Sequence, residues 1–254
     1  MHLGLFAFGG VITTGTLHIV ATPIGNLGDF PPRAVEILNS VELILAEDTR
    51  SFATLASRFG IVKPVQSCHE HNEKGRIEPA IELLKEGKSI ALVSDAGTPL
   101  ISDPGYRLVE RCKAEGITVS GVPGPCAAVF ALSISGFEAD CFVFHGFLPQ
   151  KKGKRKKLLQ RALSEHYTAI FYESPHRILS TLEILAELDP KRLVFIGREL
   201  TKHFEECLTA SSTELHKLLS SRAAIKGEFV MIIKRGEHSV QEDEETLLET
   251  DSET

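Results

Sequence analysis

Short apolar runs alternate with helical stretches of about ten residues, and this alternation limits the possible folds more than any other feature of the chain. The apolar runs of the first half that we interpret as strands are 17–22, 43–46, a short run near 65, 89–93 and 117–120. Alternating strands and helices are typical of βαβ units, which build mostly parallel sheets with right-handed crossovers. We therefore expect an α/β protein.

A second α/β domain is predicted after residues 136–140, where a new strand begins. The elements expected in it are strands at 141–145, 168–172, 192–196, 206–209 and 228–234 and helices at 150–164, 175–187 and 213–219. We expect the last two strands to run antiparallel, so that the sheets of the protein are mixed but mostly parallel. The predicted domains are 17–136 and 140–236, flanked by an N-terminal extension (1–16) and a C-terminal tail (237–254).

Composition and charge indicate a globular body with an acidic tail. Hydrophobic residues make up 43% of the 254 residues, and no apolar run approaches the roughly 18 residues that a membrane span requires. Eight of the 34 acidic residues, and none of the 28 Lys and Arg residues, lie in 237–254. We therefore expect a disordered acidic tail and a slightly basic folded body.

The N-terminus and the cysteines favour a cytoplasmic location. The first 16 residues are apolar and Gly-rich, but no Lys or Arg precedes their apolar part, which disfavours a signal peptide. The five cysteines are odd in number and none is spaced as C-x-x-C, which favours free thiols in a reducing compartment.

A long loop after the strand at 89–93 is the first candidate for a ligand site. Residues 93–105 read V-S-D-A-G-T-P-L-I-S-D-P-G, and a helix is predicted to begin at Tyr106. Loops at the carboxyl ends of strands in open α/β sheets are where ligands bind. The alternative interpretation is a long surface turn.

Several familiar motifs are incomplete or absent. Gly87-Lys88-Ser89 resembles the end of a phosphate-binding P-loop, but Glu82 stands where the upstream Gly is needed. Gly25-x-x-Gly28 is only part of a dinucleotide fingerprint, and the sequence has no G-x-S-x-G. The run 68–71 (C-H-E-H) has no second ligand pair at a familiar spacing, so we expect a polar loop there and no metal.

A run of bases near the start of the second domain favours contact with nucleic acid. Its members, with no acid between them, are Lys151, Lys152, Lys154, Arg155, Lys156 and Lys157. This charge density attracts phosphate backbones, although charge runs are also common on solvated helix faces. Aromatic residues are not interleaved with the run, so stacking on single-stranded bases is not indicated.

Two charged clusters follow strands of the second domain. Glu173 and His176 come after the strand at 168–172, and Arg198, Glu199 and Lys202 come after the next strand. Each cluster suits acid–base chemistry, and each equally suits helix capping or ion pairing. The residue pattern leaves both interpretations open.

Taken together, these segments resemble the tetrapyrrole-methylase superfamily, and within it the methyltransferases of small-subunit ribosomal RNA. The matching segments are V-A-T-P-I-G-N-L-G-D (20–29), A-E-D-T-R (46–50), H-E-H-N-E (69–73), S-D-A-G-T-P-L-I-S-D-P-G (94–105), V-P-G-P (122–125), G-F-L-P-Q-K-K-G-K-R (146–155), Y-E-S-P-H-R (172–177), G-R-E-L-T-K (197–202) and K-G-E-F-V (226–230). The resemblance spans about 17–236, and the whole set in this order is specific although no single member is.

The resemblance implies two α/β domains with S-adenosylmethionine in a cleft between them, in a homodimer. Members of this subtype methylate the ribose 2′-oxygen of a cytidine in the decoding region of 16S rRNA. The expected partner is therefore 16S rRNA or the small ribosomal subunit. A sulfonium methyl donor is already a strong electrophile, so no metal is needed and the protein mainly positions the reactants.

The resemblance also implies roles for individual residues. The residues expected to contact the cofactor are Pro23, Asp95, Gly97, Thr98, Ile101, Cys126, Ala127, Tyr172 and Gly227. Cys126 stands where Ser is more usual in this family, a small-for-small exchange that leaves a backbone role possible. The acid–base candidates are Glu173, His176, Arg198, Glu199 and Lys202, and the first-domain alternatives, which could instead hold RNA, are Asp29, Glu47, Asp48, Arg50 and the loop 69–71.

Three functions remain open on the sequence. The first is a ribosomal RNA 2′-O-methyltransferase, which the basic run favours. The second is a tetrapyrrole methylase that acts at ring carbons, for which we would expect an open apolar trough and no lysine-rich helix. The third is a non-catalytic RNA-binding protein with the same fold, whose RNA binding would not depend on the cofactor.

Overall fold

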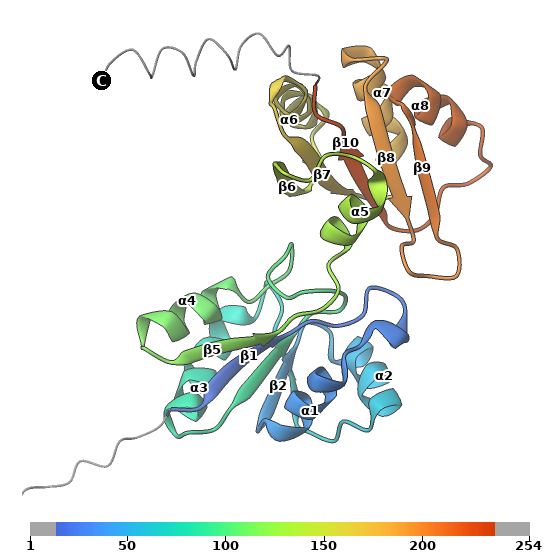
Figure 1. Ribbon diagram of the computed structural model, residues 1–254. Helices are drawn as coiled ribbons and strands as arrows, with labels where there is room; N and C mark the ends of the chain where they lie inside the picture. Colours follow the sequence, from blue (N-terminus) through green and yellow to red (C-terminus); the bar gives the residue numbers. More distant parts are fainter. Residues whose placement is uncertain (1–13, 237–254) are drawn as a thin grey trace, which may run out of the picture. The chain divides into compact units, whose positions relative to one another are not determined.

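The computed structural model describes residues 14–236. They form two compact units that divide between Cys126 and Ala127, and each unit has a five-stranded sheet with helices packed on it (Figure 1). The predicted tail, and the predicted extension up to residue 13, lie outside the described residues. None of the helices in the described part is both long enough and apolar enough to span a bilayer.

The first unit is built on a fully parallel sheet in the order β3-β2-β4-β1-β5. Its strands are β1 (Thr16–Val20), β2 (Leu43–Ala46), β3 (Val65–Ser67), β4 (Ile90–Val93) and β5 (Thr118–Val122). One core cluster lies under α1 (Pro32–Ser40) and α2 (Thr49–Phe59), and the other under α3 (Glu73–Lys85) and α4 (Tyr106–Ala114). The predicted βαβ alternation is confirmed here.

The strand order creates a switch point between the neighbouring strands β1 and β4. From β1 the chain passes through α1 to β2 on one side, and from β4 it passes through α4 to β5 on the other. Because α1 and α4 cover opposite faces of the sheet, the loops after β1 and β4 leave in opposite directions. Ligands of open parallel sheets bind at such a point, outside the carboxyl ends of the strands.

The second unit has a mixed sheet in the order β6-β7-β10-β8-β9. Its strands are β6 (Phe142–Phe147), β7 (Thr168–Glu173), β8 (Leu193–Arg198), β9 (Glu206–Ser211) and β10 (Phe229–Ile233). β6 and β7 are parallel, whereas β9 and β10 both pair antiparallel with β8, as expected for the last two strands. Its helices α6 (Lys152–Ser164), α7 (Ile178–Leu188) and α8 (Ser212–Ser220) share one core cluster with the sheet.

The division between the units differs from the predicted boundary at 136–140. Helix α5 (Ala127–Ser135) contacts β7 and β10 and belongs to the second unit, whereas the predicted boundary places these residues in the first domain. The helix is almost entirely apolar, so its sequence does not tell which sheet it covers. The Pro-Gly-Pro turn at 123–125, rather than Gly136, precedes the change of unit.

The helix boundaries follow local signals in the sequence. Pro32 opens α1, where a missing N–H is tolerated. The Asp48 carboxylate accepts the Arg50 N–H at the start of α2, and Gly60 ends that helix with a positive φ of 65°. Such signals are local, which is why the element positions could be predicted closely.

Gly105, at the start of α4, gives a test of the packing in the first unit. Its φ is +122°, and an added Cβ would lie 2.4 Å from Leu92 Cδ2, so Gly105→Ala combines backbone strain with crowding. We expect the free energy of unfolding to fall by about 2 kcal/mol or more, measured by urea unfolding. Gly60→Ala is the matched control, because a Cβ there meets nothing within 4 Å and only the strain of about 1 kcal/mol applies. Equal losses in the two variants would contradict the crowding.

Candidate active site

The loop after β4 is fixed to the end of β1 by reciprocal hydrogen bonds. The Thr22 N–H donates to the Gly97 carbonyl (2.8 Å), and the Gly97 N–H donates to the Thr22 carbonyl (3.0 Å). The Thr22 hydroxyl donates to the Ser94 carbonyl, and the Ser94 hydroxyl donates to the Gly97 carbonyl, both at 3.1 Å. Thr22 and Ser94 are buried, so the start of the loop is anchored in the interior.

The backbone of this loop is strained as well as anchored. Besides Gly97 and Gly105, the non-glycine residues Leu100 (φ 74°) and Ser102 (φ 69°) have positive φ. Such residues cost of order 1–3 kcal/mol each, and they persist where the surroundings determine them, often at functional sites. This geometry favours a ligand loop over the alternative of a long surface turn.

The turn after β5 meets the same edge of the sheet. The Thr98 hydroxyl donates to the Pro125 carbonyl at 3.0 Å. A Cβ added at Gly124 would lie only 2.7 Å from the Ala21 Cβ, so this close approach to the end of β1 requires glycine. Hydrogen bonds and close packing therefore join the first residues of the segments that follow β1, β4 and β5.

The expected cofactor contacts divide between the units. The six that lie in the joined segments of the first unit are Pro23, Asp95, Gly97, Thr98, Ile101 and Cys126. In the second unit, the Tyr172 hydroxyl accepts a hydrogen bond from the Ala128 N–H (3.2 Å), next to Ala127 at the start of α5. Gly227, the ninth, lies before β10 and belongs to a different cluster, described below.

Four carboxyl groups gather where β2 and β4 end. The Asp48 N–H donates to Asp95 Oδ1 at 3.1 Å. Burial, followed by the charge of Asp95, raises the pKa of Glu47, and burial also raises the pKa of Asp95. Burial and the charge of Glu47 raise the pKa of Asp103 to about 7. Asp48 is the exception, because hydrogen bonds from Arg50 lower its pKa to about 2.

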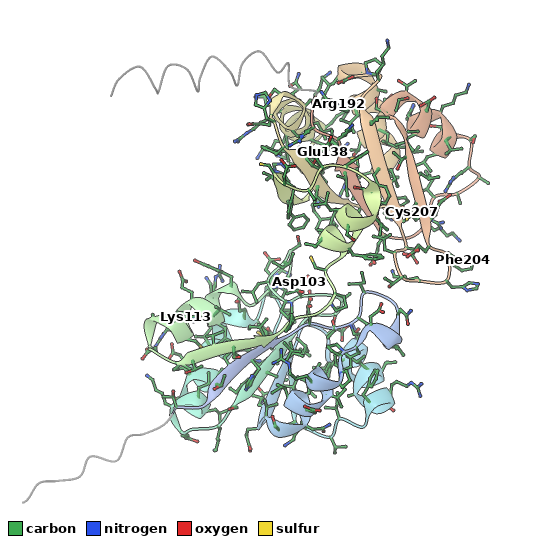
Figure 2. The ribbon with its side chains drawn as sticks, viewed as in Figure 1. Asp103, Lys113, Glu138, Arg192, Phe204 and Cys207 are labelled. Atoms are coloured by element: carbon green, nitrogen blue, oxygen red, sulfur yellow. The ribbon has the colours of Figure 1, made fainter. Side chains whose placement is uncertain are left out.

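A pocket of about 650 Å³ opens beside Asp103 within the first unit. Its lining comes from the segments after β2, at the start of α3 and at the start of α4, namely Glu47, then Glu70, His71, Glu73 and Lys74, and then 102–107. Figure 2 shows Asp103 on the loop that leads into α4, at the end of the sheet where the strands finish. Glu47 and the loop 69–71 were predicted from the sequence, but Asp103 was not, because Asp-Pro-Gly is typical of a turn.

No group of three or more His, Cys, Asp or Glu residues between 14 and 236 is arranged to hold a metal ion. The two rings of the loop 69–71 instead lie edge to face, with His69 and His71 centroids 6.0 Å apart.

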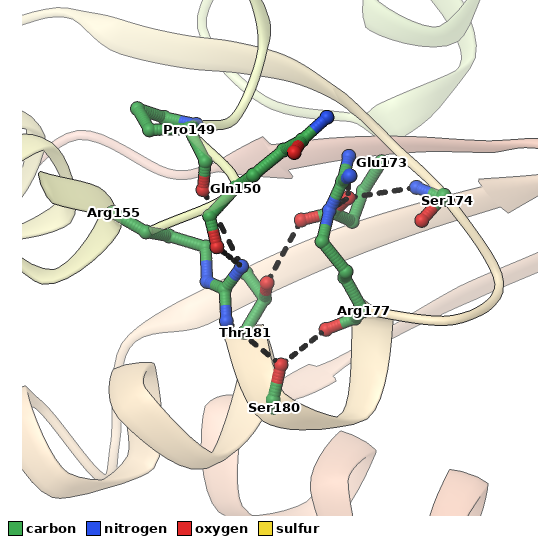
Figure 3. Close-up of polar contacts among 8 residues, drawn as sticks. All are labelled: Pro149, Gln150, Arg155, Glu173, Ser174, Arg177, Ser180 and Thr181. Atoms are coloured by element: carbon green, nitrogen blue, oxygen red, sulfur yellow. Dashed lines mark hydrogen bonds and ion pairs between the residues drawn. The ribbon is translucent and has the colours of Figure 1, made fainter. Parts of the chain in front are cut away.

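In the second unit, the Glu173 carboxylate is buried and closely bonded. Its Oε1 accepts from the Ser174 N–H and from the Arg177 guanidinium, both at 2.8 Å, and its Oε2 accepts from the Thr181 hydroxyl at 2.9 Å (Figure 3). The side chain has no exposed surface. This environment suits the structural interpretation, in which Glu173 fixes the chain before α7; its neighbour His176 is exposed.

The second charged cluster is tied to the segment before β10. Lys202 Nζ donates to Glu199 Oε1 (3.0 Å) and to Glu228 Oε2 (2.8 Å), and Glu199 Oε1 also accepts the Glu228 N–H (2.9 Å). Burial lowers the pKa of Lys202, but its bonds to the two carboxylates outweigh burial and raise it overall. A Cβ at Gly227 would lie 2.5 Å from Glu199 Cγ, so the residue has no room for a side chain. Arg198 donates from Nε to the Lys226 carbonyl at 2.6 Å.

Arg155 belongs to the basic run, but its side chain is buried. It is only 4% exposed, and its guanidinium donates to Ser180 Oγ (2.9 Å) and to the carbonyls of Pro149 and Gln150 (both 3.4 Å) (Figure 3). These bonds connect α6 to α7 and to the segment before α6. Arg155, predicted to bind RNA, is therefore not available to phosphate in this structure.

The lysines of the run divide into two groups. Lys152 and Lys156 pair with Glu183 and Glu187 of α7, at 3.7 and 3.1 Å. The lysines that are exposed, with no carboxylate within 4 Å among the described residues, are Lys151, Lys154 and Lys157. They lie at or near the N-terminus of α6, where the helix dipole adds a partial positive charge. An anion is the partner that such a surface favours.

The two-unit α/β fold is shared with a solved structure. The structure of the methyltransferase CobJ superposes with a TM-score of 0.66, covering 88% of this chain and 95% of CobJ at 20% identity, which shows a shared fold. The chain belongs to the tetrapyrrole (corrin/porphyrin) methylase family, whose model matches residues 16–216.

Two relatives have much higher sequence identity to this chain than CobJ has. Ribosomal RNA small subunit methyltransferase I of Haemophilus influenzae is 48% identical over 233 residues, which are 91% of this chain and 82% of that protein. The protein of the same name from Thermotoga maritima is 50% identical over 200 residues, 79% of this chain and 90% of its own length. The resemblance inferred from the motifs is thus confirmed, and the chain is a methyltransferase by family.

Replacing Glu173 tests whether this carboxylate is structural. Because Glu173→Gln leaves Arg177 partly buried without its ionic partner, we expect the free energy of unfolding to fall by about 3 kcal/mol in thermal or urea unfolding. The control is Glu183→Gln on α7, whose half-exposed carboxylate pairs at 3.7 Å and should contribute less than about 1 kcal/mol. A Glu173→Gln protein as stable as the control would argue against the structural role.

Proposed function

We propose that the protein transfers the methyl group of S-adenosylmethionine to the ribose 2′-oxygen of a cytidine in the decoding region of 16S rRNA. The relatives named above support ribosomal RNA as the substrate. Within this chain, the observation that carries the proposal is the unpaired lysine surface of α6, made of Lys151, Lys154 and Lys157. For a methylase acting on tetrapyrrole ring carbons we expect an open apolar trough and no lysine-rich helix.

The first unit fits the cofactor chemically. The joined segments supply backbone groups around Gly97 and Thr98, and the φ of +91° at Gly97 is one that favours glycine. The nearby carboxyl groups Asp95 and Glu47 suit a ligand that carries a sulfonium and an ammonium charge. When bound, the cofactor supplies an electrophilic methyl group. The residues proposed to hold it are Pro23, Asp95, Gly97, Thr98, Ile101, Cys126, Ala127, Tyr172 and Gly227.

The lysine surface is proposed to hold the RNA backbone without reading sequence. Three ammonium groups beside the positive end of a helix dipole repel one another, and phosphate groups relieve this repulsion. Lys152 and Lys156 already have carboxylate partners and contribute less. Recognition of the particular cytidine would come from the shape of the RNA around an exposed nucleotide.

Other expectations stay predictions. The acid–base candidates in the second unit are Glu173, His176, Arg198, Glu199 and Lys202, and the contacts above favour structural roles for Glu173, Glu199 and Lys202. The homodimer, the cytoplasmic location and 16S rRNA or the small subunit as the form of the substrate are likewise part of this proposal.

The test is methyl transfer from labelled S-adenosylmethionine to small ribosomal subunits that lack the modification, with naked 16S rRNA and a precorrin-type tetrapyrrole in parallel. The labelled RNA is then hydrolysed in alkali, because a 2′-O-methyl group removes the internal nucleophile and leaves one linkage uncut. Label in an alkali-resistant dinucleotide supports the proposal. Label only in the tetrapyrrole, or RNA binding with no transfer to any substrate, contradicts it.

The division of the lysines gives a matched pair of variants. Lys154→Gln combined with Lys157→Gln removes two unpaired charges, and we expect weaker RNA binding with a salt-dependence slope reduced by about 1.5. Lys152→Gln combined with Lys156→Gln removes the same charge from the same helix but releases two glutamates, and should change the slope less. Filter binding at several salt concentrations measures both. Equal slopes for the two double variants would show that ion pairing on α6 does not select the RNA contacts.

A further inference from the structure

Hydrogen bonds of one buried carboxylate connect the walls of the pocket in the first unit. Its walls are joined by Glu73, a buried carboxylate at the start of α3 whose Oε1 accepts the N–H groups of Gly105 (3.2 Å) and Arg107 (3.1 Å). One N–H group in the first turn of α4, that of Arg107, and the N–H group of the preceding Gly105 are therefore already bonded. Gly105 packs against Leu92 with no room for a Cβ. The cavity of about 650 Å³ lies within the range of pockets that enclose small molecules.

The lining of this pocket combines three kinds of group. Lys74 and Arg107 line it as exposed cations, and neither has a carboxylate within 4 Å among the residues that the structure describes. Tyr106 offers a ring that is 63% exposed, with its hydroxyl donating to Glu110 at 2.8 Å. Asp103 is half-buried and lies close enough to Glu47 for their charges to interact.

These groups match the parts of one nucleotide. Cations bind a phosphate, an exposed aromatic ring stacks on a base, and carboxylates accept hydrogen bonds from ribose hydroxyls. A fully apolar ligand would leave Asp103 and Glu47 without partners in the pocket. A purely anionic ligand would be repelled by them, so a ligand with an anionic part and a hydroxyl-bearing part fits best.

We propose that this pocket binds the nucleotide of the RNA that is methylated, and that the Asp103 carboxylate accepts the proton of its 2′-hydroxyl. This inference rests on the proposed function and adds a substrate site and a base to it. The phosphate lies toward Lys74 and Arg107, the base lies against Tyr106, and the ribose lies toward Asp103. As the 2′-oxygen bonds to the methyl carbon, its proton passes to Asp103 and the electron pair of the broken carbon–sulfur bond stays on sulfur.

The surroundings of Asp103 suit a proton acceptor near neutral pH. Burial and the charges of Glu47 and Asp95 raise its pKa to about 7, and the Ser94 hydroxyl acts in the opposite direction. The remaining charged groups of the pocket are Glu70, His71, Glu73, Lys74 and Arg107. A base is most effective when its pKa is close to the working pH. By contrast, the carboxylates of Glu173 and Glu199 are already bonded to neighbouring donors.

The first experiment measures binding without chemistry. Cytidine 5′-monophosphate is titrated into the full-length protein by calorimetry, and we expect Arg107→Gln to weaken binding about tenfold through loss of a charge-assisted contact. Lys113→Gln is the matched control, because it removes one exposed cation from the other end of the same helix, outside the pocket (Figure 2). Equal affinities for the wild type and Arg107→Gln would overturn the nucleotide site.

The second experiment measures the rate of transfer as a function of pH. The wild-type rate should rise through about pH 7 and level off as Asp103 loses its proton. In Asp103→Asn the rate should fall by about 10²–10⁴-fold and lose this step, while binding of S-adenosylmethionine is unchanged. Glu78→Gln, an exposed acid of α3 outside the pocket, should keep the wild-type profile.

The outcomes separate this inference from the proposed function. Wild-type methylation of RNA together with full activity of Asp103→Asn would overturn Asp103 as the base and leave the proposed function intact. Absence of RNA methylation by the wild type, with nucleotide binding that depends on Arg107, would overturn the proposed function and Asp103 as the base but support the site. Absence of both would overturn the two together.

Discussion

The reciprocal hydrogen bonds between Thr22 and Gly97 are the constraint on which the site of the first unit depends. They join the chain after β1 to the chain after β4 at the point where the strand order reverses. At the far end of the loop, the buried Glu73 carboxylate accepts the Gly105 N–H. Because both ends of the loop are fixed, the loop cannot simply move to relieve the strain of the positive φ angles at Leu100 and Ser102. The anchors therefore determine both the loop proposed to hold the cofactor and the wall of the pocket proposed to hold the nucleotide.

Most of the fold could be predicted because the relevant signals are local. The apolar runs, the proline that opens α1 and the glycine that ends α2 each act within a few residues. The position of α5 could not be predicted in this way, because an apolar helix carries no record of which sheet it covers. The contacts of α5 with β7 and β10 decide that question, and they place the division between the units after Cys126.

For the candidate site, too, the sequence did not predict which side chains contact distant segments. The sequence identified Glu173 and Arg155 as charged residues in suggestive places, and the structure shows both buried. Glu173 is hydrogen-bonded to the start of α7, and Arg155 connects α6 to α7. Asp103 shows the converse, since a residue read as part of a turn lies in a pocket beside other acids. Charge is visible in a sequence, whereas burial and pairing depend on distant segments.

The raised pKa of Asp103 has a consequence for stability as well as for chemistry. The folded protein holds this proton up to about pH 7, whereas an unfolded Asp releases it near pH 4. Between these values the folded state binds more protons than the unfolded state, so this group's contribution to stability falls as pH rises from about 4 to about 7. Above pH 7 the full destabilisation remains, because the carboxylate stays charged in a half-buried, acidic setting. An asparagine would avoid this loss, and a carboxyl group here is understandable if its proton transfer is used.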